Sequence, residues 1–149
     1  MDRRQKIFVL IILIIFVILV LLGTILLIDK NREFNDFVDT IKTNIYNTYI
    51  VKVEYSDTTN EDGEVESGKV VFITNPEVVD DIVDIFSNAK MDNYNALEEN
   101  TDLGYTIEFL DKDNEVIIKV DNEVLTYKED TLKVTYNQDE VVDLIKSVE

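Results

Sequence analysis

The longest apolar stretch of the chain runs from Ile7 to Ile28 and contains no charged residue. Ile, Leu, Val and Phe fill it except at Gly23 and Thr24, so a helix formed here would have no polar face. At about 1.5 Å per residue, a helix of this length measures about 33 Å, close to the ~30 Å of a bilayer's hydrocarbon core. The stretch therefore predicts one transmembrane anchor, residues 7–28, which includes Ile7, Phe16, Gly23 and Ile28.

Two other interpretations fit this stretch less well. A buried helix of a soluble protein would show a polar stripe, which is absent here. A cleavable signal peptide fits the basic residues Arg3, Arg4 and Lys6, but its apolar core is usually about 7–15 residues long and is followed by a small-x-small site. No such site follows Gly23. We therefore expect an uncleaved signal-anchor.

The basic residues also predict the orientation of the anchor. Three of them precede the apolar stretch and only Lys30 and Arg32 follow it closely, and cytoplasmic flanks are the richer in Lys and Arg. We expect residues 1–6 to form a cytoplasmic tail and the C-terminal part to be extracytoplasmic. The predicted location is the cell membrane, with a single pass.

A helical pattern of apolar residues follows the anchor, within residues 29–47. Its members recur three or four residues apart and are Phe34, Phe37, Val38, Ile41 and Ile45. They predict an amphipathic stalk helix, which can continue the anchor because residues 29–33 contain neither Gly nor Pro. The stripe could pair with another helix as a coiled coil or pack on its own domain. We favour packing on its own domain, since the stripe is shorter than three heptads.

Residues 48–149 alternate between strand and helix patterns. Alternating apolar positions predict a strand at 49–55, and a hairpin tip at 57–66 with Gly63 leads to a returning strand at 69–73. Asn75 and Pro76 are typical of a helix start, and the residues after them form a wide apolar face. Segment 91–104 is polar and is expected to be a loop.

The rest of the chain predicts a meander and a final helix. Four strands are expected at 105–110, 116–120, 123–127 and 132–136, joined by turns rich in Asp and Asn. Asn137 and Glu140 are placed as a capping box for the last helix. The fold class is therefore α+β: a two-layer domain with a mainly antiparallel sheet of about six strands packed by two helices.

Charge separates the two ends of the chain. The whole chain carries −17, and residues 29–149 hold 30 acidic against 11 basic residues. Such a domain repels phosphates, so we expect binding neither to nucleic acid nor to an anionic lipid surface. The charge could serve solubility alone or attract a basic partner, and solubility is the favoured interpretation.

Composition also limits the chemistry. The chain has no His, Cys or Trp, which excludes disulfides, Ser-His and Cys-His catalysis and the usual zinc sites. Pairs of carboxylates could in principle hydrolyse glycosides, but so many acids make such a pair uninformative. We expect no enzyme activity and no cofactor.

The acidic loops carry the oxygen ligands that calcium prefers, but their spacing does not fit a calcium loop. With Gly63 at the sixth position of an EF-hand loop, Lys69 falls at the twelfth, where a bidentate Glu is needed. In "DKDNEV" Val116 stands where the Gly should be. Hairpin turns explain both stretches better, so no metal site is expected.

The sequence predicts a noncatalytic binding or accessory module that acts on another envelope protein with a basic surface. The polar residues expected to contact that partner, or a weakly bound cation, are Asp57, Glu61, Asp62, Glu64, Glu66, Glu98, Glu99 and Asp102. The alternative is a cation- or ligand-sensing domain that is coupled through the stalk helix to a membrane partner or a homodimer.

Two segments carry a resemblance to known proteins. They are "FITNPEVVDDIVDIFSNAK" and "YTIEFLDKDNEVIIKVDNEVLTYKEDTLKV". This region, Val70 to Val134, resembles small extracytoplasmic domains of unknown function on membrane-anchored or secreted proteins of low-GC Gram-positive bacteria. The resemblance implies an extracytoplasmic location and an α+β fold, and it implies no activity.

Overall fold

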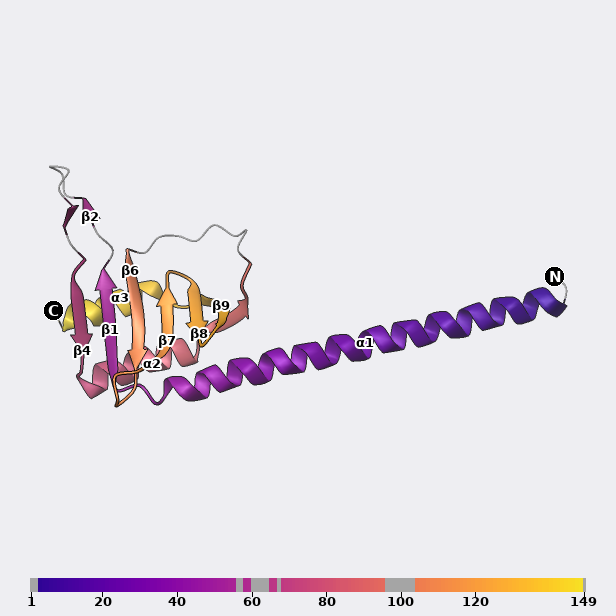
Figure 1. Ribbon diagram of the computed structural model, residues 1–149, viewed down its shortest axis with the longest axis horizontal. Coiled ribbons are helices and arrows are strands. Elements are labelled where there is room, and N and C mark those ends of the chain that lie inside the picture. Colours follow the sequence, from indigo (N-terminus) through magenta and orange to yellow (C-terminus); the bar gives the residue numbers. More distant parts are fainter. Residues whose placement is uncertain (1–2, 56–57, 60–64, 67, 96–103, 149) are drawn as a thin grey trace. The chain divides into compact units, whose positions relative to one another are not determined.

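The computed structural model describes residues 3–55, 58–59, 65–66, 68–95 and 104–148 (Figure 1). The chain forms two compact units, Met1–Asp39 and Thr40–Glu149.

A single helix, α1 (Arg3–Ile45), contains the predicted anchor and the predicted stalk except for its last two residues, 46–47, which form a turn. From Ile7 onward it is long and apolar enough to cross a membrane, and the most apolar part of it is unburied. Thr24 lies in the apolar stretch, and its hydroxyl donates to the Leu21 carbonyl at 2.8 Å. This bond satisfies the polar group within the helix itself, as a helix in lipid requires. The absence of Gly and Pro between anchor and stalk explains why they form one helix.

The second unit is built on an antiparallel sheet of seven strands, in the order β4-β1-β6-β7-β8-β9-β5. Its strands are β1 (Ile50–Tyr55), β4 (Val70–Ile73), β5 (Lys90–Asn93), β6 (Tyr105–Leu110), β7 (Val116–Asp121), β8 (Val124–Tyr127) and β9 (Asp130–Thr135). A separate two-stranded pair is formed by β2 (Thr58–Thr59) and β3 (Val65–Glu66). The expected α+β class and antiparallel sheet are confirmed.

The main sheet has one strand more than the expected six, β5, which overlaps the start of the expected 91–104 loop. β5 pairs antiparallel with β9, which places Met91 opposite Val134. Met91 is buried while Lys90 and Asn93 are exposed. A single buried residue in a four-residue strand leaves too short an alternation to detect in the sequence.

The turns of the meander use the left-handed backbone region. Asn114, Asn122 and Lys128 have φ of 62°, 57° and 56°. In the turn after β6, Asp111 Oδ1 accepts hydrogen bonds from the backbone N–H groups of Asp113 and Glu115, at 2.8 and 2.9 Å. Asn tolerates this region, and an Asp that caps its own turn sets the chain reversal locally.

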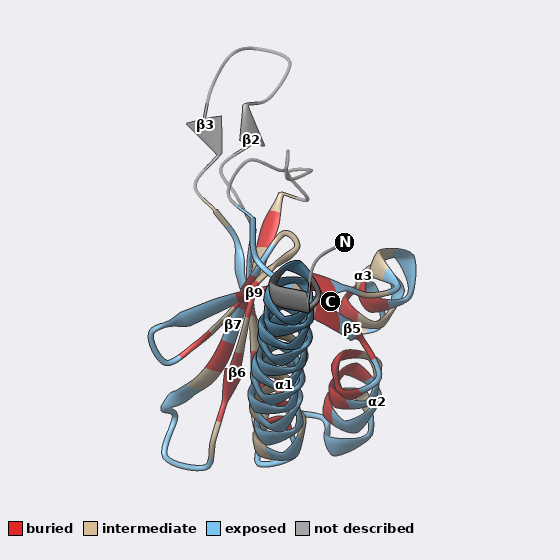
Figure 2. Cartoon of the chain, turned by 90° about the vertical axis from the view of Figure 1, so that its right-hand side faces the viewer, coloured by how far each residue is buried: buried red, intermediate tan, exposed pale blue. Residues whose placement is uncertain are grey.

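Two capped helices cover one face of the sheet. α2 (Pro76–Ser87) starts after Asn75, whose side chain accepts from the Glu77 N–H at 3.1 Å. α3 (Gln138–Ser147) starts after Asn137, whose side chain accepts from the Glu140 N–H at 3.4 Å. Figure 2 shows the buried residues on the inner sides of these helices and on the strands that face them.

The core joins the sheet, α2 and the last turns of α1. Phe86 of α2 makes an edge contact with Phe109 of β6, with ring centroids 5.0 Å apart. Ile41 and Ile45, the last two residues of the expected stalk stripe, are fully buried in the second unit. The Asn44 amide next to them donates to the Tyr127 hydroxyl at 3.0 Å. The domain therefore begins at the end of α1, ahead of its first strand.

We predict that Ile41→Ala lowers the free energy of unfolding of the second unit by about 2–5 kcal/mol, as truncation of a fully buried Ile does. Thr43→Ala, an exposed position on the same helix, should change it by less than about 0.5 kcal/mol. Urea denaturation of both variants, followed by far-ultraviolet circular dichroism, measures the difference. Equal stability of the two variants would show that the end of α1 does not belong to the core.

Two tyrosines lie near the start of α3, of which Tyr105 is buried and Tyr136 is partly buried. Burial raises the pKa of Tyr105 above its ordinary value, and burial together with the nearby Tyr105 raises the pKa of Tyr136 strongly. The Tyr136 hydroxyl donates to the Asn122 carbonyl at 3.2 Å, while the buried Tyr105 hydroxyl has no hydrogen-bond partner among the described residues. Both side chains are therefore held in the neutral form in the fold.

This burial predicts a loss of stability at alkaline pH. Because the folded-state pKa values are raised, the unfolded chain releases the two protons near pH 10 while the folded chain retains them, so unfolding is favoured as the pH rises above about 10. Below about pH 9 the two groups should have no effect on stability. Tyr136→Phe should reduce the alkaline loss, measured by urea denaturation from pH 8 to 11. An unchanged alkaline loss would contradict burial of this hydroxyl.

Candidate functional site

The acidic residues expected to contact a partner fall on the segments around the β2–β3 pair and before β6. Those outside the described residues are Asp57, Glu61, Asp62, Glu64, Glu98, Glu99 and Asp102. The backbone of Glu66 lies in β3, opposite Thr58. Their role as a contact surface stays a prediction, and the candidate site has to be sought among the other residues.

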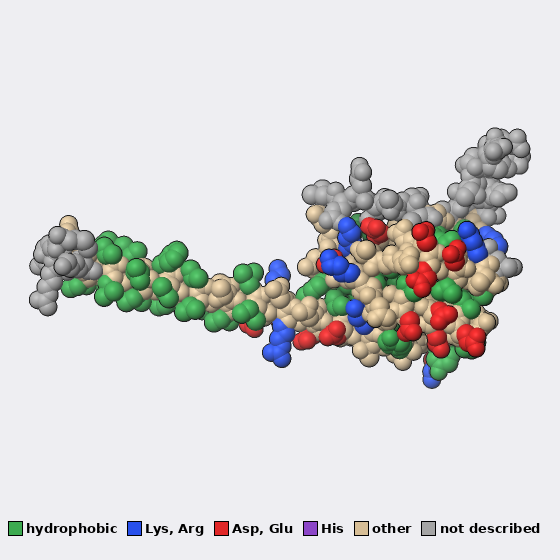
Figure 3. Space-filling view, turned by 180° about the vertical axis from the view of Figure 1, so that it is seen from behind, with side chains coloured by type: hydrophobic (Ala, Val, Ile, Leu, Met, Phe, Trp, Pro, Cys, Tyr) green, Lys and Arg blue, Asp and Glu red, His purple; other side chains and the backbone are tan. Residues whose placement is uncertain are grey.

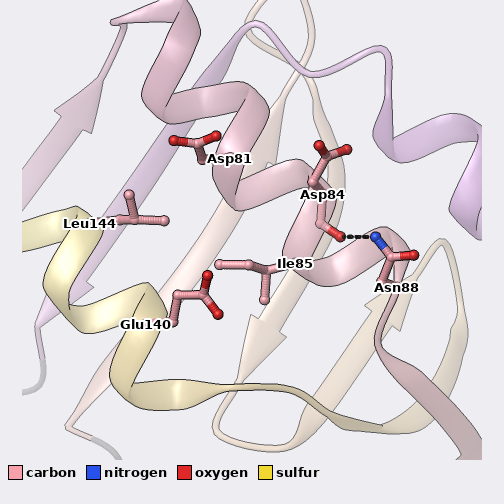
Figure 4. A pocket seen from close by; sticks show the side chains of 6 residues that line it. All are labelled: Asp81, Asp84, Ile85, Asn88, Glu140 and Leu144. Atoms are coloured by element: carbon pink, nitrogen blue, oxygen red, sulfur yellow. Dashed lines mark hydrogen bonds between the residues drawn. The ribbon is translucent and has the colours of Figure 1, made fainter.

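A groove between α2 and α3 brings acidic and apolar side chains together (Figure 4). Its volume is about 400 Å³, and it is lined by Asp81, Asp84, Ile85, Asn88, Glu140 and Leu144. Asp84 and Ile85 of α2 lie three and four positions after Asp81, Asn88 is the C-cap of the same helix, and Glu140 and Leu144 of α3 are four positions apart, so each set lies on one side of its helix. The helix period and the side-by-side packing of α2 and α3 build the groove together.

The carboxylates of the groove have no counter-ion within the described part of the chain. Neither Lys nor Arg there forms an ion pair with Asp81, Asp84 or Glu140. Asp84 Oδ1 accepts a hydrogen bond from the Tyr46 hydroxyl at 3.3 Å, and Glu140 Oε2 accepts one from the Asn137 amide at 3.1 Å. These contacts orient two of the carboxylates but leave their charge uncompensated. The groove is a site of negative potential.

The apolar part of the lining limits which cation would fit. Ile85 and Leu144 are half-buried and lie between the carboxylates in the close view (Figure 4). Lys and Arg bury their alkyl stems on apolar surface while the charged head stays at a polar rim. Across the residues that the structure describes, no group of three or more His, Cys, Asp or Glu could hold a metal ion. The lining therefore fits a Lys or Arg side chain better than a bare metal ion.

A second pocket differs from the groove because its lining contains a basic residue, Lys112. It measures about 380 Å³ and is lined by Asn44, Asn47, Tyr49, Asp111, Lys112 and Ile117. The Asp111 carboxylate is already engaged by the turn that it caps. Its lining holds one acid and one base, so no net charge favours a particular ligand there.

Three charged side chains on the sheet face away from the helices form a paired cluster. Lys52 Nζ lies 2.8 Å from Glu108 Oε2 and 3.4 Å from Glu54 Oε2. The hydrogen bond to Glu108 raises the pKa of Lys52. Because cross-strand pairs of opposite charge stabilise a sheet, this cluster is explained by the fold and calls for no ligand.

Acidic side chains also gather over the helical face of the second unit, whereas hydrophobic side chains surround much of α1 (Figure 3).

Comparison of the chain with protein-family models, with curated proteins and with solved structures found no match. The resemblance of Val70 to Val134 to small extracytoplasmic domains therefore stays a prediction. The site has to be interpreted from its own chemistry.

The sequence pattern predicts the positions of the groove acids one by one but not that they lie together. The apolar face predicted for the helix after Pro76 leaves Asp81 and Asp84 on its polar side, and Glu140 is predicted as a capping residue. The periodicity shows which side of a helix is polar, but it does not show which other helix lies beside that side. An uncompensated acid pair at helical spacing next to an apolar residue is the only local signal for the groove.

Proposed function

We propose that this protein is a noncatalytic binding module, anchored in the cell membrane by α1, that recognises a basic segment of another envelope protein. The observation that carries the proposal is the α2–α3 groove, in which three uncompensated carboxylates surround two apolar side chains. A Lys or Arg side chain of the partner would place its stem on Ile85 and Leu144 and its charge among the carboxylates.

The net charge of the whole chain also favours a basic binding partner. A net charge of −17 attracts basic proteins over a distance and accelerates their association. The groove adds a defined binding site for a basic side chain of such a protein. Each exposed ion pair contributes only about 0.2–1 kcal/mol, so several pairs and the apolar contact have to act together. Such a module binds reversibly and is sensitive to salt.

Sensing is the second candidate function, and one observation favours it. α1 runs without a break from Arg3 to Ile45, and its last residues are buried in the second unit. A helix that ends in a core can transmit a change between the anchor and the domain. Calcium-dependent peptide binding in the experiment below would favour this candidate over simple docking.

We predict that neutralising the groove weakens binding of a synthetic peptide in which lysines alternate with leucines. The variant Asp81→Asn, Asp84→Asn, Glu140→Gln of the full chain in detergent should bind about tenfold more weakly, because three exposed pairs of about 0.2–1 kcal/mol each are lost. Fluorescence anisotropy of the labelled peptide measures the change, and affinity should also fall as salt rises.

The matched control removes three charges away from the groove. Asp113→Asn, Glu115→Gln, Glu129→Gln changes exposed turn residues and alters the net charge by the same amount. This variant should bind the peptide within about twofold of the unaltered chain, since only the long-range field is reduced. If both triple variants weaken binding equally, the groove is not the docking site and the charge acts only as a field.

A further prediction concerns orientation. Protease added outside intact cells should remove the part of the chain beyond Lys30 and leave the N-terminal tail protected, because the basic residues Arg3, Arg4 and Lys6 keep it inside. Tags at the two ends, detected on blots with and without membrane permeabilisation, provide the measurement. Protection of the C-terminal tag in intact cells would reverse the proposed topology, and release of a shorter soluble form would indicate signal cleavage.

A further inference from the structure

The two edges of the seven-stranded sheet differ in how they are protected. At one edge, β5 carries Lys90 and Asp92, whose side chains form an ion pair at 2.8 Å. Charges on an edge strand are a common device against pairing with another chain. At the other edge, β4 reads Val-Val-Phe-Ile and has no charge. Only the β4 edge is open to pairing by this criterion.

Two apolar side chains of β4 are exposed to solvent, which is unfavourable for an edge strand that has no further partner. Phe72 is 58% exposed and Val70 is 43% exposed, whereas Ile73 is buried. Val70 and Phe72 lie two residues apart, so both project from the sheet face away from the helices. The edge thus presents an aromatic and a β-branched side chain on the same face.

The backbone of the same two residues points outward. Tyr55 N–H donates to the Lys69 carbonyl at 2.9 Å, so Tyr55 and Lys69 form a hydrogen-bonded pair of the β1–β4 ladder. Hydrogen-bonded pairs alternate along an antiparallel ladder, so Val71 and Ile73 bond to β1 while Val70 and Phe72 direct their N–H and C=O groups away from it. No strand among the described residues lies on that side.

We propose that β4 pairs antiparallel with β4 of a second copy of this chain, centred on Val71, and joins the two sheets. In this register Val70 faces Phe72 of the second copy and Phe72 faces its Val70, so all four outward backbone groups of each strand are used. Cross-strand pairs of an aromatic and a β-branched side chain stabilise a sheet. Pairing one register step away would leave Phe72 opposite Gly68 or opposite a second Phe72.

Charge complementarity supports the same register. In the sheet, Lys52 lies beside Phe72 and Glu54 lies beside Val70. Each row across the junction would therefore run from Lys52 through Phe72 and the second copy's Val70 to its Glu54. The four residues at the junction are uncharged, and opposite charges flank each row. No like charges face each other at the contact.

The contact is small, so its strength should depend on conditions. Two strands of four residues bury less than the ~1,200 Å² of a stable protein–protein interface. Confinement of copies to one membrane would raise their effective concentration, a gain that rests on the proposed anchoring. Because both copies are acidic, added salt should strengthen this association, whereas it should weaken binding of a basic peptide. Self-association through β4 and peptide binding in the groove should therefore respond to salt in opposite directions.

A single introduced thiol tests the register directly. The chain has no Cys, so the thiol introduced by Val71→Cys can form a disulfide only with the same thiol of a second copy. The two Cα atoms at position 71 would be about 4.5 Å apart, within the range of disulfides. At position 74 they would be about 20 Å apart, so Thr74→Cys is the control. Full-length chain reconstituted in lipid vesicles and oxidised should give a covalent dimer on non-reducing gels with Val71→Cys and not with Thr74→Cys.

A second substitution tests the side chains at the junction. Phe72→Lys in the Val71→Cys background should reduce the dimer at least fivefold, because it places a charge in each row. Val116→Lys, at an exposed apolar position away from both edges, should leave the dimer unchanged. Circular dichroism confirms that each variant is folded. Equal crosslinking at positions 71 and 74, or no effect of Phe72→Lys, would overturn the proposal, and unchanged peptide binding by the same variants would leave the proposed function standing.

Discussion

The burial of Phe86 holds the second unit together. This ring lies on α2, contacts Phe109 of a central strand and lies 4.5 Å from the ring of Tyr136, which precedes α3. One side chain therefore joins the sheet, the first covering helix and the approach to the second. An acidic chain without disulfides depends on such apolar contacts, because neither ion pairs nor covalent links replace them. The groove proposed as the docking site requires that this contact holds α2 and α3 beside each other.

The candidate groove is a consequence of that packing. Once the apolar side of α2 is buried against the sheet, Asp81, Asp84 and Asn88 lie on its accessible side next to α3. α3 is capped by Asn137, which also donates to the carboxylate of Glu140 and so orients one acid of the groove. The residues that start a helix and the residues that line the site are partly the same. A substitution in this region should therefore be checked for folding before it is interpreted as a loss of binding.

Two sets of charged residues in the unit have different roles. Lys52 and Glu108 are paired within the sheet, and Lys90 and Asp92 are paired on one edge. The carboxylates of the groove have no such partner within the described residues. Paired charges specify the sheet and protect its edge, whereas uncompensated charges can attract a partner. The uncharged β4 edge differs from both groups, which is why it is proposed for contact between copies.

Local patterns in the sequence were enough to predict the apolar helix, the two capped helices, the meander and the α+β class, since each depends on residues within a few positions of one another. Asn75, Asn137 and the Asp and Asn residues of the turns act through hydrogen bonds of that short range. Long-range contacts decided the rest. β5 exists because Met91 is buried opposite Val134, and Ile41 belongs to the core because the end of α1 packs there. The groove and the free β4 edge also depend on which elements become neighbours, and hydrophobic periodicity shows which side of an element is buried but not what it is buried against.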